Sequence, residues 1–308
     1  MRLQKGKKNC ILMKSRKTEE YMNIYDETRF ILNKYHLTAN KKLGQNFLVD
    51  DEAIEKIVEA ANITKNDLII EIGPGLGTLT KLMLEKAGKV IAIELDDRMV
   101  EVLNDRFIAY NNFDLINEDV LKVNLKELIE KEKKEEIKTA KVVANLPYYI
   151  TTPIIMKLLE DKLEIESITV MIQKEVADRL VTKPGTGDTG AITHSIKYYT
   201  NPERVTEVPN TSFIPAPEVN STVIKLNLLD KPAVEVQSEE MLFKVVKVAF
   251  MQKRKTLLNS LSNSGLFGTK QEVEEMLEEL NIDTNKRAEK LSLEDFANIA
   301  NYMCGFNL

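Results

Sequence analysis

Asp67-Leu68-Ile69-Ile70-Glu71-Ile72-Gly73-Pro74-Gly75-Leu76-Gly77 carries an apolar run directly into three alternating glycines. A short apolar run before a glycine-rich turn predicts a buried strand that leads into a helix, here through Lys86. Glycine suits such a turn because it adopts left-handed backbone angles and lets a ligand approach the main chain closely. The stretch therefore predicts a strand, a ligand-binding turn and a helix.

Further apolar runs alternate with helical patterns after this turn, which is typical of a parallel α/β sheet. A polar segment, 230–238, separates them from a helical pattern that runs from Glu239 onward. We therefore expect a Rossmann-like α/β domain over residues 25–229 and a small all-helical domain over 238–308. The further strands are predicted at 90–94, 113–117, 141–144, 168–172 and 222–226.

The composition limits the class of protein. A chain of 308 residues with 43% hydrophobic content can bury a large core and form about two domains. It has no apolar run near the ~20 residues of a membrane span, so we expect a cytosolic protein. Cys10 and Cys304, like His36 and His194, lie far apart in sequence, which argues against a disulfide framework and against a metal site.

The formal net charge of −5 hides a local excess of positive charge. Residues 1–46 hold 11 Lys and Arg against 4 Asp and Glu, a net charge of +7, which leaves −12 for the remainder. Lys41-Lys42 and, later, Lys253-Arg254-Lys255 are candidate phosphate contacts. A basic run of three residues is also compatible with a solvated helix face, so this pattern alone does not establish RNA binding.

Acidic residues at two predicted strand ends narrow the choice of cofactor. The glycine turn alone suits nicotinamide or flavin cofactors, S-adenosylmethionine, or a purely structural turn. Glu94, 21 positions after Gly73, is placed to accept ribose hydroxyls, a feature that NAD proteins share. Asp119 can accept a hydrogen bond from an adenine amino group, which favours S-adenosylmethionine, although a helix-capping Asp is the alternative.

The fourth predicted strand ends in Asn145-Leu146-Pro147-Tyr148, which suggests methyl transfer to an amino group on a base. The lone pair of such an amine is delocalised into the ring, so acceptors must draw the nitrogen toward a tetrahedral shape. Asn145 Oδ1 and the Leu146 carbonyl can do so. Pro147 fixes the turn, and Tyr148 offers a face on which a flipped base can stack.

Six motifs follow one another along the chain. They are Lys42-Leu43-Gly44-Gln45-Asn46-Phe47-Leu48, the glycine turn, Asn145-Leu146-Pro147-Tyr148-Tyr149-Ile150, Gln173-Lys174-Glu175-Val176, Phe213-Ile214-Pro215-Ala216-Pro217-Glu218-Val219-Asn220-Ser221 and Gln252-Lys253-Arg254-Lys255-Thr256-Leu257. In these motifs the chain resembles the KsgA-type small-subunit ribosomal RNA adenine dimethyltransferases, from about Tyr25 to the C-terminus. Erythromycin-resistance rRNA methyltransferases share the core but are less similar in the fourth and sixth motifs.

The resemblance implies in-line transfer of the sulfonium methyl of S-adenosylmethionine to adenine N6, twice on each of two adjacent adenosines of 16S rRNA. It implies a role in small-subunit biogenesis, with the maturing subunit as partner and a cytoplasmic monomer without metal. It places Phe213 beside the target adenine, although a core aromatic is the alternative. The implied cofactor site consists of Asn46, Leu48, Gly73, Gly75, Glu94, Asp119 and Asn145.

Other functions remain open from the sequence. They are a large-subunit rRNA adenine methyltransferase, a DNA amino-methyltransferase, a ribosome-assembly factor with little turnover and, least supported, a nicotinamide oxidoreductase. Residues 1–24 form a basic extension, of which residues 1–21 do not align with the family. We expect a disordered extension there, with a wrongly assigned start or a cloning remnant as alternatives.

Overall fold

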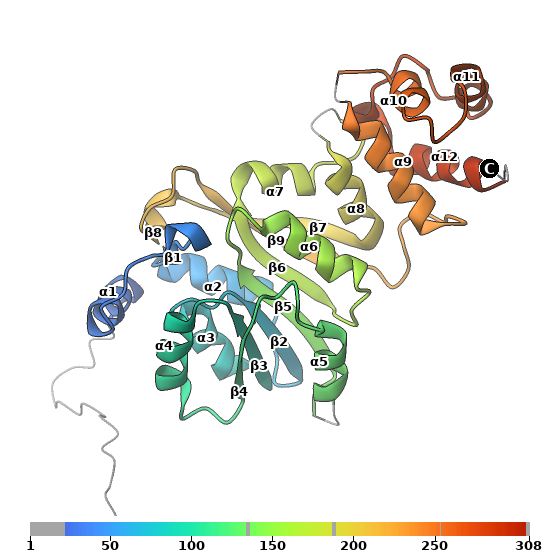
Figure 1. The fold of residues 1–308 in the computed structure, drawn as a ribbon. Helices are drawn as coiled ribbons and strands as arrows, with labels where there is room; N and C mark the ends of the chain where they lie inside the picture. Colours follow the sequence, from blue (N-terminus) through green and yellow to red (C-terminus); the bar gives the residue numbers. More distant parts are fainter. Residues whose placement is uncertain (1–21, 134–135, 187–188, 253, 306–308) are drawn as a thin grey trace, which may run out of the picture.

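The computed structural model describes residues 22–133, 136–186, 189–252 and 254–305. The predicted extension therefore lies largely outside the described residues, and α1 already begins at Ile24. A seven-stranded sheet dominates the fold (Figure 1). Its strands lie in the order β4 (Phe113–Asn117), β3 (Lys89–Glu94), β2 (Asp67–Ile72), β5 (Thr139–Asn145), β6 (Ser167–Gln173), β9 (Ser221–Leu228) and β7 (Thr200–Val208).

Strand direction and order locate the ligand-binding edge. The strands from β4 to β6 are parallel, and β9 runs antiparallel to both β6 and β7. The chain proceeds from β2 to β3 and β4 on one side, then returns to add β5 and β6 on the other. In open α/β sheets, ligands bind at the carboxyl ends of the strands where the order reverses. That point lies here between β2 and β5.

The predicted strands are all present, and the α/β expectation is confirmed. Within the seven-stranded sheet, β7 is the strand that the sequence pattern does not predict. The two-residue strands β1 (Phe47–Leu48) and β8 (Phe213–Ile214), outside this sheet, are not predicted either. The segment Asn201-Pro202-Glu203-Arg204 of β7 is polar and contains a proline, and the pairing with β9 is irregular between Arg204 and Thr206. An edge strand tolerates both features because one of its sides makes no ladder hydrogen bonds.

Helices cover both faces of the sheet. The core on one face includes residues of α2 (Asp51–Ala60), α3 (Thr78–Lys86) and α4 (Asp97–Phe107). The core on the other face includes residues of α5 (Leu125–Glu132), α6 (Thr151–Glu160) and α7 (Lys174–Val181). Helix α5 ends at Glu132, before the end of the charged stretch 126–138. Lys133, the next residue, is extended, with a ψ of 103° that a helix does not allow.

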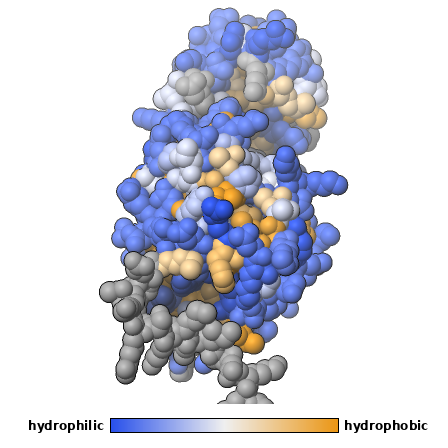
Figure 2. Space-filling model, turned by 90° about the vertical axis from the view of Figure 1, so that its left-hand side faces the viewer, coloured by the Kyte–Doolittle hydropathy of each residue, from blue (hydrophilic) through white to orange (hydrophobic). Residues whose placement is uncertain are grey.

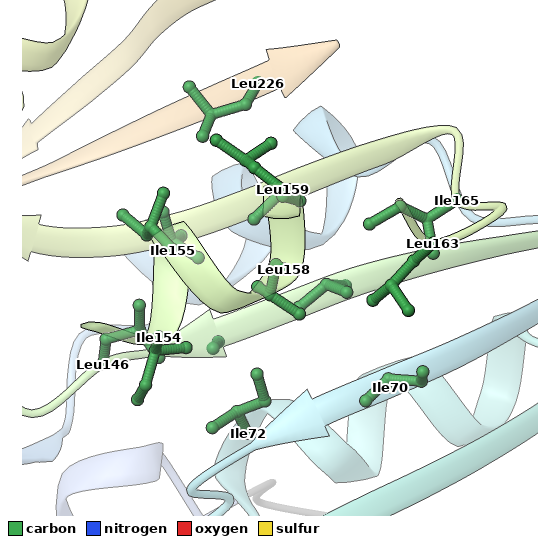
Figure 3. Close-up of a cluster of buried hydrophobic side chains, with 14 of the residues drawn as sticks. Ile70, Ile72, Leu146, Ile154, Ile155, Leu158, Leu159, Leu163, Ile165 and Leu226 are labelled. Atoms are coloured by element: carbon green, nitrogen blue, oxygen red, sulfur yellow. The ribbon is translucent and has the colours of Figure 1, made fainter. Parts of the chain in front are cut away.

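Successive side chains of β2 point to opposite faces of the sheet, so this one strand contributes residues to both cores. Leu68, Ile70 and Ile72 belong to one buried cluster, whereas Ile69 belongs to the cluster on the opposite face. Figure 3 shows Ile70 and Ile72 facing the apolar side chains of α6. The continuous apolar run is therefore typical of a parallel strand buried on both faces.

A helical part follows β9. It contains α9 (Glu239–Met251), α10 (Leu257–Asn263), α11 (Lys270–Glu279), η3 (Ala288–Lys290) and α12 (Leu293–Gly305), and has its own core. α8 (Ala191–Tyr199) links the two parts, because its His194 packs against Phe250 and Phe296. No strand occurs among the described residues after Leu228, so the helical prediction is confirmed.

The N-terminal arm closes over the carboxyl edge of the sheet. α1 (Ile24–Lys34) and η1 (Lys41–Leu43) lead into β1 (Phe47–Leu48), which pairs antiparallel with β8 (Phe213–Ile214). Leu48 lies opposite Phe213 in this pair. Segments that are distant in sequence thus form a small two-stranded sheet, the β1–β8 pair, which we call the roof (Figure 1). Helix η2 (Asn210–Ser212) directly precedes β8.

Within the described ranges, no helix is long and apolar enough to span a bilayer. The same residues contain no group of three or more His, Cys, Asp or Glu side chains arranged to hold a metal ion.

A buried hydrogen bond joins the strand before the glycine turn to the helix after it. Thr80 Oγ1 donates to Glu71 Oε2 over 2.5 Å, and the Glu71 side chain is only 1% exposed. Burial raises the pKa of Glu71 to about 8, and the negative charge of Glu94 acts in the same direction. Glu71 is therefore mostly protonated at neutral pH.

The glycine turn needs glycine for two separate reasons. Gly73, Gly75 and Gly77 have φ of +66°, +57° and +82°, a region that residues with a Cβ rarely adopt. In addition, a Cβ on Gly77 would lie 2.5 Å from the Phe107 ring, whereas one on Gly73 would meet nothing within 4 Å. Only Gly77 is constrained by packing as well as by its backbone.

Gly77→Ala should therefore destabilise the protein more than Gly73→Ala. Left-handed strain costs each variant about 1–2 kcal/mol, and overpacking adds about 1–3 kcal/mol to Gly77→Ala alone. Urea unfolding of the ligand-free proteins measures the difference. Equal losses of unfolding free energy would contradict the packing of Phe107 against the turn.

The stability of the ligand-free protein should fall as pH rises toward 8. Because the folded protein binds the Glu71 proton more tightly than the unfolded chain, this contribution is complete below pH 4.5 and is lost as pH passes about 8. Glu71→Gln should remove that part of the pH dependence, and Glu85→Gln, at an exposed position of α3, should keep it. Urea unfolding from pH 5 to 9 tests this, and parallel curves for both variants would refute it.

Candidate active site

The predicted site residues surround one cleft at the carboxyl ends of β2, β3 and β5, under the β1–β8 pair. The cleft is open to solvent, and the space between its walls, open solvent included, is about 1110 Å³. Its lining includes every residue expected at the cofactor and reaction sites: Asn46, Leu48, Gly73, Gly75, Glu94, Asp119, Asn145, Leu146, Tyr148 and Phe213.

Glu94 holds the glycine turn against the end of β3. Its Oε2 accepts a hydrogen bond from the Gly75 N–H at 3.0 Å, and its Oε1 accepts from the N–H groups of Leu95 and Asp96 at 2.9 Å each. Burial raises the pKa of Glu94, while these three donors oppose the shift. A carboxylate has about four lone-pair sites, so one acceptor position stays available for a ligand hydroxyl.

Asp119 has one oxygen occupied and one available. Its Oδ1 accepts from the Leu121 N–H at 3.0 Å, which stabilises a turn between β4 and α5. The alternative that Asp119 caps a helix is therefore wrong, because the segment that its hydrogen bond stabilises is a turn. Asp119 Oδ2 has no partner among the described residues and lies on a half-buried side chain of the cleft wall.

The orientation of Asn145 follows from its partner on the arm. Its Nδ2 donates to the main-chain oxygen of Asn46 at 3.4 Å. An oxygen can only accept, so the amide nitrogen must face Asn46 and Oδ1 must face away from it. The Leu146 N–H donates to the Met171 oxygen, but the Leu146 carbonyl has no partner within the described part of the chain. Two acceptors therefore remain unpaired beside the cleft.

Two aromatic residues contribute differently to the wall. The Tyr148 hydroxyl lies 2.7 Å from Ser221 Oγ, which fixes a half-buried ring, and burial raises the Tyr148 pKa. Phe213 is only 4% exposed and belongs to a core cluster that also contains Leu48 and Val223. It is both a core aromatic and part of the cleft lining, so its contact with a base stays a prediction.

Contacts from the arm supply residues that sequence reasoning missed. Gln45 Nε2 donates to Asp96 Oδ2 at 2.9 Å, which ties the arm to the segment after β3. Arg106 donates to the main-chain oxygen of Leu76 in the glycine turn and to Glu27 Oε1 of α1, the latter at 2.5 Å. Gln45 lies in a quoted motif, but no local pattern identifies Arg106, because its partners are distant in sequence.

The predicted phosphate contacts lie in two places. Lys41 and Lys42 are exposed on η1, next to the cleft-lining residues 43–48. Arg254 and Lys255 are exposed between α9 and α10, outside the cleft lining, and Lys253 falls outside the described residues. Lys286 adjoins this second group, since its main-chain oxygen accepts from the Leu257 N–H at 2.7 Å. Local sequence could not show that neighbour.

Comparison with known proteins identifies the family. The chain matches the ribosomal RNA adenine dimethylase family over residues 36–304. Ribosomal RNA small subunit methyltransferase A of Alkaliphilus oremlandii (strain OhILAs) is 48% identical over 275 residues, which is 89% of this chain and 95% of that protein. The protein of the same name from Clostridioides difficile (strain 630) is 46% identical over 282 residues, 91% of this chain and 96% of its own.

Solved structures agree with the fold. A dimethyladenosine transferase from Plasmodium falciparum has a TM-score of 0.68 at 26% identity and covers 82% of this chain and 95% of that one. The 23S rRNA methyltransferase ErmE has a TM-score of 0.64 at 24% identity, covering 84% and 100%, and its likeness concerns the fold alone. On the family match and these close relatives, the chain belongs to the ribosomal RNA adenine dimethylase family.

Proposed function

We propose that the protein transfers methyl groups from S-adenosylmethionine to N6 of two adjacent adenosines of small-subunit rRNA, two to each base. The observation that carries this is the pair of unpaired acceptors, Asn145 Oδ1 and the Leu146 carbonyl. They share a cleft with two strand-end carboxylates. The arrangement suits an amine that must be held while a nucleoside-bearing cofactor lies beside it.

The residues around the cleft fit S-adenosylmethionine. The space beside Gly73 is open to a ligand that approaches the main chain. Glu94 retains an acceptor position for a ribose hydroxyl, and Asp119 Oδ2 is available for an adenine amino group. Leu95 and Val120 add apolar surface to the same wall. Asn46 and Leu48 close the cleft from the arm, where β1 is fixed by β8.

Asn145 and Leu146 supply the chemistry of the amine. Their oxygens would accept the two N–H bonds of the exocyclic amino group and draw its nitrogen toward a tetrahedral shape. When bound, S-adenosylmethionine supplies an electrophilic methyl group. Positioning then provides most of the rate, and no general base is required. The amine proton can leave through Asn145 Oδ1, the Leu146 carbonyl or water.

Aromatic and basic residues would hold the RNA. Tyr148 offers its ring face to the extruded adenine, with Phe213 as the opposite wall, at about 1–3 kcal/mol for each stacking contact. Lys41, Lys42, Lys253, Arg254 and Lys255 would contact phosphates. In this proposal residues 25–229 form the catalytic domain, and 238–308 form an RNA-binding domain. The protein acts as a cytoplasmic monomer, without metal, in small-subunit biogenesis.

The comparisons favour this reading over the alternatives. The relatives at 46–48% identity are named for the small subunit, whereas the likeness to the large-subunit enzyme ErmE concerns the fold. An assembly factor without turnover would not need two aligned, unpaired acceptors beside the glycine turn.

Asn145→Ala should reduce methyl transfer at least about 100-fold, because a positioned acceptor at the reacting amine is lost. Binding of RNA should be nearly unchanged. Transfer from labelled S-adenosylmethionine to unmodified small subunits, followed by mapping of the modified nucleosides, measures the first effect. A filter-binding assay measures the second. Asn227→Ala on β9 is the matched control, and equal loss of transfer and RNA binding in Asn145→Ala would argue against the proposed role.

Replacing Lys253, Arg254 and Lys255 together by Ala should reduce the salt dependence of RNA binding. The slope of log K against log salt should become shallower by about 2–3, since each lost phosphate contact contributes about 0.7–0.9. The control replaces three exposed lysines near α5: Lys122, Lys126 and Lys131. If the first variant kept the wild-type slope, the proposed phosphate contacts would have to be abandoned.

A further inference from the structure

Tyr149 is a large aromatic residue on the rim of the cleft with no role in the proposed chemistry. Its side chain is 58% exposed, and it lines the cleft beside Tyr148. Whereas the Tyr148 hydroxyl is bound to Ser221, the Tyr149 hydroxyl has no hydrogen-bond partner among the residues the structure describes. An isolated exposed aromatic is common on protein surfaces, so its surroundings must decide whether it binds anything.

The arm fixes one side of the Tyr149 ring. A Cβ on Gly44 would lie 3.3 Å from Tyr149 Cδ1, so the main chain of the η1 turn packs directly against the ring. Gly44 also has φ of +61°, which suits glycine at this position. The turn that carries Tyr149 is itself closed, because the Ile150 N–H donates to the Pro147 oxygen at 3.2 Å. The ring is therefore in contact with the arm and still 58% exposed.

Two exposed lysines lie on the turn that packs against this ring. Lys41 and Lys42 belong to η1, which Gly44 follows as the C-cap residue, and neither lysine forms an ion pair with any described residue. An aromatic face beside unpaired cations is the combination that binds single-stranded nucleic acids, with a base on the ring and phosphates on the cations. Figure 2 shows that the face carrying the arm has hydrophobic residues gathered near its middle, within a polar surface.

We propose that Tyr149 is the stacking platform for the nucleotide that adjoins the target adenosine, with Lys41 and Lys42 holding its phosphate. The proposal rests on the proposed function, since it assumes that an extruded base occupies the space beside Tyr148. Consecutive residues of one turn then bind consecutive nucleotides. Tyr148 takes the reacting base, and Tyr149 takes its neighbour outside the cleft. We call the nucleotide on Tyr149 the outer one and the nucleotide beside Tyr148 the inner one. Because an RNA strand has a direction, the outer nucleotide always lies on the same side of the inner one.

A tryptophan reporter tests the contact directly. The chain contains no tryptophan, so Tyr149→Trp introduces a single tryptophan, whose fluorescence a stacked base quenches. Without any cofactor, a single-stranded RNA with two adjacent adenosines should quench it. An abasic residue at the outer adenosine should abolish the quenching, and one at the inner adenosine should not. Tyr25→Trp, on the 44% exposed Tyr25 of α1, is the control and should not respond.

Kinetics on unmodified small subunits supply the second test. Tyr149→Leu keeps the apolar bulk but removes the ring, and should raise KM for the subunit about 5- to 100-fold. KM for S-adenosylmethionine and kcat should stay within twofold of the wild-type values. Tyr149→Phe should behave as wild type, because stacking needs the ring and not the hydroxyl.

Three results would overturn the proposal: no quenching of Tyr149→Trp, quenching that needs only the inner base, or a Tyr149→Leu variant with wild-type KM. These results are separate from a failure of the proposed function, which would be seen as no methylation by the wild-type protein. The fluorescence test involves no methyl transfer, so stacking can be established or rejected independently of the reaction.

Discussion

The pairing of β2 with β3 on one side and with β5 on the other is the constraint on which the site depends. It brings Gly73, Glu94 and Asn145 to one edge of the sheet, although they span more than seventy positions of the sequence. The hydrogen bond from Gly75 to Glu94 then fixes the turn relative to β3, and the one from Asn145 to Asn46 fixes the roof relative to β5. The proposed cofactor site and the proposed base site thus depend on the same sheet register.

Much of this arrangement could be predicted from the sequence, because its signals are local. Buried parallel strands appear as apolar runs, and left-handed turns appear as glycines. β7 escaped prediction because its stability comes from pairing with β9 and not from its own composition. Two further sets of contacts could not be predicted: those of Arg106 with Leu76 and Glu27, and that of Tyr149 with Gly44. They join segments that lie close together only in the folded chain.

Phe213 shows why residue roles are harder to predict than folds. The sequence offered a choice between a core aromatic and a wall of the base site, but the residue packs in a core cluster and also lines the cleft. Its pairing with Leu48 explains how both can hold, because β8 is part of the core and also the roof. A residue at such a boundary couples the stability of the roof to the shape of the site.

The last constraint is electrostatic, because a chain with a net negative charge must bind RNA, a polyanion, at a cleft that is lined by carboxylates. Burial keeps Glu71 mostly protonated at neutral pH, which removes one negative charge at the base of the cleft. Three main-chain N–H groups surround the Glu94 carboxylate and offset part of its field. Lys41 and Lys42 stand at the rim without ion-pair partners among the described residues. The repulsion that an RNA strand meets at the cleft is therefore smaller than the number of acidic residues around it suggests.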